Sequence, residues 1–574
     1  MISLFAALGN IYAQSPTLPT LPQKTVSLTL PMQGTSACPT LTTGSNCIRN
    51  VPSGDASSFQ NAINASTCGD TIVLVAGSTY NGNFTVPSSS CNGWIVIESS
   101  ALPSLPTNGN RVGPSNAADM AKISTPNAAP AIRFLPNSNH WRLMGLEITT
   151  SFSKTGYPNF GLVAAGLQAD GSTSINVQAQ LPAYLIFDRI YIHGLSDAST
   201  KRGIQMDTQD IAIVDSYCDE IHALGQDSQC FGSWNGSGPF LIQNNFIQAG
   251  AENIMFGGAD PAITNLVPSD ISIVGNLIQK NTAWRGRAAP YNWVVKNLFE
   301  LKNAQRVLLD GNVLQYTWAE AQDEALIIRS ANQSGACTWC VVQDVTVTHN
   351  IIQHAPIGVV LAPIGGLYPA LPTGRVLIQN NVLNDISSVN WGTRGCLFQL
   401  VAETAFPVHD WIIDHNTGFD DGCYAIIGDS GTIQNLQLTN NIGTYGTYGI
   451  FGSGASPGNN ALNLYAPVRV YDHMVFITSS GTCLRCTYPS GTFYNTQTGV
   501  DFTNYAGGNF QLTSSSPYYH AGTDGKDVGV WDWTCLNSDS AAALAGRFVS
   551  GTNGCALSVD LLLQPPTAVS AVVQ

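Results

Sequence analysis

Charge is scarce in this sequence. Only 10% of its 574 residues are charged, and 23 Lys and Arg stand against 37 Asp and Glu, for a net charge of −14. Nucleic-acid binding needs a basic surface, so this balance argues against a nucleic-acid partner. An acidic ligand would have to be held by local Lys or Arg side chains or by a bridging cation.

Long apolar runs and helical patterns are also missing. Beyond the first residues, no run reaches the roughly 18 apolar residues of a membrane span. Amphipathic Glu/Lys/Leu patterns are almost absent, and neither a Gly-rich phosphate loop nor a serine-nucleophile elbow occurs. We therefore expect no membrane span, no helical array and no nucleotide-binding loop.

What the chain does contain is a recurring short phrase in which apolar and polar residues alternate up to a final Asn. Its successive Asn residues are spaced by 31, 36, 38, 31, 35 and 25 residues. Alternation with a period of two indicates strands, and repetition at this spacing is typical of a solenoid. The copies are LIQNN at Leu241–Asn245, SIVGN at Ser272–Asn276, LLDGN at Leu308–Asn312, VTHN at Val347–Asn350, LIQNN at Leu377–Asn381, IIDHN at Ile412–Asn416 and LTNN at Leu438–Asn441.

Irregular spacing suits a right-handed parallel β-helix, in which insertions bulge out as loops between stacked coils. We predict an all-β fold of about ten or more coils, with Arg189 and Ser216 at the Asn position of earlier coils. Stacked Asn amides can bond one another along the axis, and Asn tolerates a left-handed turn. The repeated Asn residues are therefore expected to be scaffold rather than site.

The rest of the chain divides by composition. The run SFQNAINASTCGDTIVLVAG, ending at Gly77, resembles the N-terminal cap of pectate-lyase-like β-helices, and a cap is needed to cover the first coil. The predicted divisions are a signal-like segment at 1–14, a Pro/Thr/Ser-rich linker at 15–50, a cap and first coils at 51–130, the β-helix at 131–450, C-terminal coils and cap at 451–560, and a linker toward a further module at 561–574.

Fourteen cysteines and the signal-like start indicate a secreted or surface protein with disulfides. Two C-x-x-C pairs, Cys337–Cys340 and Cys483–Cys486, could bind zinc or form disulfides, and export favours disulfides. Cys396 and Cys423 occupy matching places in adjacent coils, within disulfide range.

Charged residues recur at one position of the strand that precedes the Asn phrase. Because equivalent positions stack in a β-helix, we predict a column of mostly alternating charges about 5 Å apart. The column is either an ion-pair ladder or a groove in which Asp227, Glu252 and Glu324 hold Ca²⁺ while Lys or Arg reacts with a sugar. Its predicted members are Arg202, Asp227, Glu252, Lys296, Glu324 and Arg394.

A second cluster lies beside this column. Glu300 and Lys302 flank Leu301, so both side chains point to one face. The run LKNAQRVLLDGN at Leu301–Asn312 resembles a motif of the β-helix lyases that include alginate lyases and chondroitinase B. The resemblance places Lys302 where that family has a catalytic Arg, and Arg306 at a matching Arg.

The same resemblance implies two Ca²⁺-binding Glu residues and a Lys base on the preceding coil. This sequence has Glu252 for the first Glu, but Ile254 and Ala259 at the other two places. Lys302, Lys296 and Arg202 are the candidate catalytic residues. Alternatively, Lys302 only pairs with Glu300 or Glu252.

Two loops carry aromatic and basic residues that suit sugar binding. Trp234 and Trp284 either stack on sugar rings or cover the solenoid, and Arg285 and Arg287 could meet carboxylates. With Arg306 and Glu300, they form the predicted substrate-binding set. Polygalacturonase and pectate-lyase motifs are matched only in fragments.

These observations predict a secreted, monomeric protein that acts on a polysaccharide, and they favour a lyase that cleaves an acidic, uronate-containing glycan by β-elimination. Calcium is the expected cofactor, if any. The alternatives are a non-catalytic glycan-binding or adhesive solenoid and a glycoside hydrolase.

Overall fold

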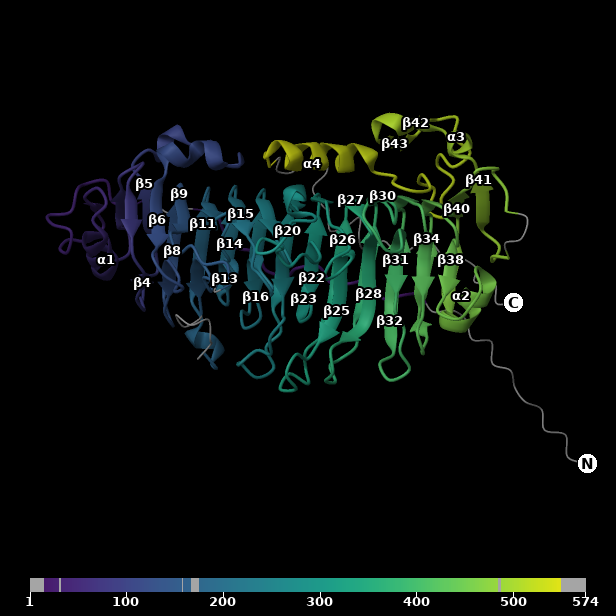
Figure 1. Ribbon diagram of the computed structural model, residues 1–574, viewed down its shortest axis with the longest axis horizontal. Helices are drawn as coiled ribbons and strands as arrows, with labels where there is room; N and C mark the ends of the chain where they lie inside the picture. Colours follow the sequence, from purple (N-terminus) through teal and green to yellow (C-terminus); the bar gives the residue numbers. More distant parts are fainter. Residues whose placement is uncertain (1–14, 30–32, 157, 167–174, 484–486, 549–574) are drawn as a thin grey trace, which may run out of the picture.

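The chain winds into a right-handed parallel β-helix whose coils stack along the long axis of the molecule (Figure 1). The computed structural model describes residues 15–29, 33–156, 158–166, 175–483 and 487–548. Three long sheets form the walls: sheet I with 15 strands, sheet II with 14 and sheet III with 12. Each complete coil contributes one strand to each sheet, in the order I, II, III.

Sheet III carries most of the residues of interest. Eleven of its 12 strands lie between residues 131 and 453, close to the predicted number of coils. Its strands are β4 (Phe84–Val86), β7 (Ile132–Phe134), β10 (Val163–Ala165), β13 (Arg202–Met206), β16 (Gln229–Ser233), β19 (Ile254–Phe256), β22 (Phe299–Leu301), β25 (Glu324–Ala331), β28 (Ile357–Gly365), β31 (Cys396–Leu400), β34 (Cys423–Ile427) and β38 (Ile450–Gly452).

One coil illustrates how the sequence pattern becomes structure. Strand β17 (Phe240–Gln243) of sheet I is followed by two Asn residues, β18 (Phe246–Ala249) of sheet II and then β19. In β17, Phe240 and Ile242 are buried in one core cluster that runs the length of the solenoid. Burying such side chains in every coil removes apolar surface from water, which is the main stabilising term of the fold.

The Asn residues stack as predicted. Each ladder Asn donates from Nδ2 to Oδ1 of the Asn in the next coil, at 2.9–3.1 Å, from Asn245 through Asn441. The same Oδ1 also accepts the backbone N–H of the preceding ladder Asn. Ser216 extends the ladder by accepting from Ile190, so the position assigned to Arg189 belongs to Ile190.

The left-handed residue of this corner is the one before the ladder Asn, not the Asn itself. Asn244, His349 and His415 have φ values of 54°, 53° and 52°, and Gly275 and Gly311 fill the same position in other coils with φ of 64°. Arg189, with φ of 54°, belongs to this column. Asn and Gly tolerate this conformation best, which explains the Asn-Asn and Gly-Asn pairs in the sequence.

A C-terminal return segment, residues 518–548, runs back along that left-handed column. It includes helix α4 (Trp533–Ala545), which lies lengthwise on the solenoid in Figure 1. Thr523 bonds Asn440 in both directions, the Trp531 N–H donates to Asn380, and Asn244 donates to the Gly546 carbonyl. The segment therefore joins coils that are nearly 200 residues apart in the sequence.

The first coil is covered by helix α1 (Ala56–Ala65), whose Phe59 and Ile63 are buried. The remaining helices are α2 (Asn459–Tyr465) and α3 (Gln497–Val500) near the C-terminal coils. No helix among the described residues is both long and apolar enough to cross a membrane. The signal-like segment at 1–14 and the linker at 561–574 lie outside the described residues.

Disulfides replace the zinc alternative at the first C-x-x-C pair. Cys337 and Cys340 are bonded to each other, and Cys396 and Cys423 are bonded across adjacent coils with a Cα–Cα distance of 4.5 Å, as predicted. The other described pairs are Cys38–Cys47, Cys68–Cys91 and Cys218–Cys230. Cys486 lies outside the described residues, although Cys483 is disulfide-bonded.

Candidate functional site

The predicted charge column lies at the corner where sheet II turns into sheet III, but its register differs from the prediction. Arg202 pairs with Gln229, and the pairing of Phe231 with Ile254 puts Gln229 beside Glu252. Asp227 lies two residues before the aligned Gln229, and Lys296 lies one residue before the aligned Asn297. The aligned row is Arg202, Gln229, Glu252, Asn297, Glu324, Ile357 and Cys396.

Turns of different length explain this correction, because the strands of sheet III begin at different distances after those of sheet II. Arg394 is likewise two residues before the aligned Cys396, and its Nη1 donates to Gln399 at 2.6 Å. The long Lys296 side chain nevertheless reaches Asp227 and Glu252, so these three predicted residues do form a cluster. Lys296 Nζ lies 2.7 Å from Asp227 Oδ2 and 3.5 Å from Glu252 Oε1.

Burial makes the Lys296 cluster electrostatically unusual. The Glu252 side chain is fully buried, whereas 19% of Lys296 and 40% of Asp227 remain exposed. Burial raises the pKa of Glu252, and the neighbouring Asp227 and Glu300 add to the effect. Burial opposes the charge on Lys296, but Glu252 and Asp227 outweigh it and raise the Lys296 pKa. Lys296 is therefore a charged ammonium and not a ready base.

Glu300 is the centre of a second cluster on the outer face of sheet III. Its buried carboxylate lies 3.5 Å from Lys302 Nζ and 3.1 Å from Arg329 Nη2. Asn297 joins the two clusters by donating to Glu300 Oε2 at 3.2 Å. Two cations share one carboxylate, so this group carries a net positive charge, with 12% of Lys302 and 29% of Arg329 exposed.

Glu324 opens β25 two coils after Glu252 in the aligned row. Burial and the neighbouring Asp323 carboxylate raise the pKa of Glu324 to about 7. A carboxyl group with such a pKa can accept or donate a proton at neutral pH. Of the carboxylates predicted at this corner, Glu324 is thus the one best matched to proton transfer.

Arg202 and Trp234 are brought together at the N-terminal side of the clusters. The guanidinium lies over the indole ring, with Cζ 4.8 Å from the ring centroid. Burial lowers the pKa of Arg202 to about 10, so it remains charged at neutral pH. Its Nε has no hydrogen-bond partner within the described residues, whereas Trp234 itself is buried beside Ala164. The Trp234 ring therefore supports a guanidinium group whose Nε is buried without a partner in the described part of the chain.

The loop after β21 (Leu277–Gln279) mainly covers the solenoid. Trp284 is buried and packs with Trp293 and Trp318. Arg285 lies over Trp391 and donates to the Asn390 carbonyl. Arg287 lies over the Tyr291 ring. The covering role holds for Trp284, and the structure does not bring these two Arg residues into contact with the Lys296 cluster.

The resemblance motif is divided between two walls. Lys302 directly follows β22 of sheet III, but Arg306 lies in β23 (Ala304–Asp310) of sheet I. Arg306 forms a two-point ion pair with Asp270 at 2.7 and 3.0 Å, and this pair repeats as Arg375–Asp344. Arg306 therefore belongs to a structural ladder on another face and does not join the predicted substrate-binding set.

Calcium does not fit the predicted carboxylates. The Lys296 ammonium already lies between Asp227 and Glu252, and Glu324 bonds the Asp323 N–H rather than approaching them. Ile254, at the place of the second Glu of the lyase motif, is buried in the core. The predicted Ca²⁺ triad is thus corrected: an internal cation satisfies two of its members, and the third stands apart.

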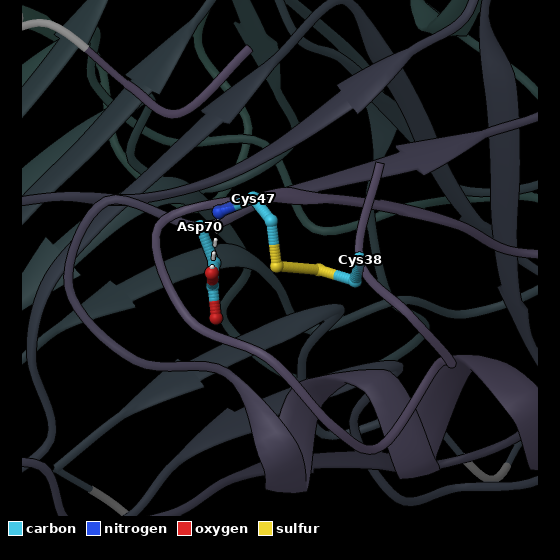
Figure 2. A group of neighbouring side chains, drawn as sticks. All are labelled: Cys38, Cys47 and Asp70. Carbon is cyan, nitrogen blue, oxygen red and sulfur yellow. Dashed lines mark hydrogen bonds between the residues drawn. A yellow bond between two sulfur atoms is a disulfide. The ribbon is translucent and has the colours of Figure 1, made fainter. Parts of the chain in front are cut away.

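One other group of carboxylate and sulfur atoms is compact enough to suggest a metal within the described chain. Figure 2 shows it: Cys38 and Cys47 are joined by a disulfide, and Asp70 accepts the Cys47 N–H at 3.0 Å. Asp70 also pairs with the buried Arg49 at 2.8 Å. The sulfur atoms and the carboxylate are therefore committed to holding the N-terminal coil together.

Sequence reasoning missed three polar residues at this corner. Arg329 could have been found as the one charged residue that follows the apolar run of β25, directly after the core residue Ile328. Gln229 and Asn297 are neutral, so no charge marks them in the sequence, although each has a buried side-chain oxygen without a hydrogen-bond partner among the described residues.

No family model and no curated protein matches this chain. Among solved structures, a mannuronic-acid-specific family 6 polysaccharide lyase from human gut microbiota aligns with TM-score 0.49 and 11% identity, covering 78% of this chain and 90% of that one. A surface adhesin of Streptococcus pneumoniae aligns with TM-score 0.37 and 14% identity, covering 71% and 91%. Pectate lyase Pel9A aligns with TM-score 0.35 and 11% identity, covering 88% and 98%. These likenesses concern the fold alone.

Proposed function

We propose that this protein is an exported enzyme that cleaves an acidic, uronate-containing polysaccharide by β-elimination at the outer face of sheet III. The observation that supports this most directly is the group of basic residues on one wall: Lys296 and Lys302 flank β22, Arg329 lies in the next strand, β25, and Arg202 opens β13, three coils earlier. This group is notable in a chain with 23 Lys and Arg and a net charge of −14.

Elimination from a uronate needs three contributions. Charge on the C6 carboxylate must be neutralised, a base must remove the C5 proton, and a donor must protonate the leaving O4 oxygen. The C5–H and C4–O4 bonds break while the C4=C5 double bond forms. No oxidant is required, and the proton taken from C5 is balanced by the proton given to O4.

We assign these contributions to residues of the two clusters. Lys302 and Arg329 carry the surplus positive charge that a substrate carboxylate can neutralise. Glu324, with its pKa of about 7, serves as the base. Lys296, charged and partly exposed, serves as the proton donor. Arg202, several coils away, binds a carboxylate farther along the glycan.

A glycoside hydrolase is the second candidate, and one observation favours it. Glu252 and Glu324 both have raised pKa values and stand two coils apart, which is about 10 Å at the strand spacing. Inverting hydrolases separate their acid and base by about 6.5–9.5 Å. Because Glu252 is fully buried, it is less available to a sugar than Glu324, and we rank the lyase first.

The deciding experiment incubates the purified protein with a panel of uronate polymers and neutral glycans. A lyase produces unsaturated ends that absorb in the ultraviolet, whereas a hydrolase produces reducing ends without that absorbance. Chelation should leave the activity unchanged, since the carboxylates that would bind Ca²⁺ are otherwise engaged. Saturable glycan binding with no new ends from any polymer would refute both enzymes and favour the adhesive solenoid.

Variants connect the activity to the site. Glu324→Gln should abolish most elimination while leaving glycan binding intact. The matched control is Glu403→Gln, which alters a partly exposed carboxyl, also with a raised pKa, in a loop outside the clusters. Equal loss in both variants would show that the effect is not specific to this wall.

A further inference from the structure

A fully buried lysine beneath the candidate site is not used by the proposed reaction. Lys280 follows β21, and only 1% of it is exposed. Its Nζ donates to the Ala249 carbonyl at 3.0 Å, to the Asn297 carbonyl at 2.8 Å and to Asn253 Oδ1 at 2.7 Å. A fourth, shorter hydrogen bond joins Nζ to the Ala251 carbonyl.

The four partners share two properties. All are neutral oxygens that can only accept, and none belongs to a carboxylate. An ammonium has three N–H donors and no lone pair, so it suits such a cage, whereas the lone pair of a neutral amine would face an acceptor. Burial lowers the pKa of Lys280 well below its ordinary value, and the Glu252 carboxylate opposes this shift. The acceptor oxygens of the cage also favour the charged form.

The cage also connects the two sides of the candidate site. Ala251 and Asn253 are the residues on either side of Glu252, and Asn297 directly follows Lys296. A single ammonium thus bonds both backbone segments whose side chains form the Lys296–Glu252 ion pair. If the cage opened, the 3.5 Å separation of that pair would no longer be fixed.

We propose that Lys280 occupies a built-in site for a monovalent cation and that its ammonium positions Glu252 against Lys296. Neutral carbonyl oxygens are the ligands that replace the hydration shell of K⁺ in channels, whereas Ca²⁺ sites in proteins usually include carboxylates. Removing the side chain at Cβ would leave an oxygen-lined space that K⁺ or NH₄⁺ can enter. The cation site is independent of the proposed function, and the positioning role depends on it.

The test compares Lys280→Ala with Lys280→Met in potassium, ammonium and choline chlorides at equal ionic strength. We expect the thermal midpoint of Lys280→Ala to rise saturably by about 1 °C in potassium or ammonium relative to choline, the size of shift that a bound ion at about five times its Kd produces in a chain of this length. Lys280→Met should not respond, because its side chain fills the space without a charge. Wild type and the control Lys122→Ala should not distinguish the salts.

Activity supplies the second readout. In Lys280→Ala, kcat should fall in choline and recover in ammonium while KM changes little, since the glycan does not touch the buried cage. Equal responses of Lys280→Ala and Lys280→Met would overturn the proposal. Failure of both variants to fold in every salt would also overturn it, because K⁺ or NH₄⁺ would then be unable to replace the Lys280 ammonium. An inactive wild type would instead count against the proposed function, since the thermal midpoints need no substrate.

Discussion

Replacing Lys296 by Met tests the electrostatics on which the candidate site depends. The substitution removes the cation that lies 3.5 Å from the fully buried Glu252. Breaking a buried ion pair from one side typically costs about 3–5 kcal/mol. Because one fifth of Lys296 is exposed and its distance to Glu252 is long for an ion pair, we expect a loss of about 2–3 kcal/mol.

The loss should depend on pH in a defined direction. Without Lys296, Glu252 stays buried only by holding a proton, so its folded-state pKa lies above the unfolded value of 4.5. The folded variant then binds more protons than the unfolded chain. Stability is therefore fully retained below pH 4.5 and falls as pH rises through the raised folded-state pKa.

Urea unfolding of wild type, Lys296→Met, Glu252→Gln and the double variant, followed by circular dichroism at acidic and alkaline pH, measures this effect. Glu252→Gln should restore most of the stability lost in Lys296→Met, since a neutral amide needs no cation. The control is Lys122→Met, whose Nζ lies 2.9 Å from Glu147 but whose side chain is 38% exposed. If Lys296→Met matched wild type at alkaline pH, the buried pair would not have the energetic role assigned to it.

Three further outcomes are expected. The kcat of wild type should rise with pH through about 7 as Glu324 ionises, and Glu324→Gln should lose this limb of the profile; a surviving limb would assign it to another group. Asn350→Ala should destabilise the fold by about 3 kcal/mol in urea titrations, because buried donors in the neighbouring coil lose their acceptor, while the partly exposed Asn384→Ala should change it little. Burial opposes the charged form of His415, but Asp414 and Asp524 outweigh it and raise the His415 pKa. The His415–Asp524 contact therefore stabilises the return segment fully below pH 6.5 and weakens as pH rises through the folded-state pKa. Proteolysis of the segment should accelerate over that pH range in wild type and be independent of pH in His415→Gln.

The fold could be predicted because its repeat has a chemical reason that is visible in one dimension. A buried amide at every coil can satisfy itself only by stacking, so Asn350 and its equivalents had to recur in register. The one-residue error at Arg189 has a similar reason. Both the left-handed position and the ladder position favour Asn, and only coordinates separate the two.

The site was less predictable because its geometry depends on turns. Nothing in the sequence fixes how many residues pass between sheet II and sheet III, so Asp227 and Lys296 were aligned two residues and one residue away from their true places. Their contact survived because a lysine side chain spans that error. Lys280 gave no signal, since a single lysine after a strand usually points into solvent, and its cage consists of backbone carbonyls that no sequence displays.

The return segment changes how the solenoid can come apart. A stack of coils held only by neighbours can peel from either end, one coil at a time. Here Thr523, Trp531 and Gly546 fasten coils from Asn440 back to Asn244, so the end cannot lift without releasing the middle. These residues are also synthesised after every coil they bind. The return segment can therefore dock on the solenoid only after those coils have left the ribosome.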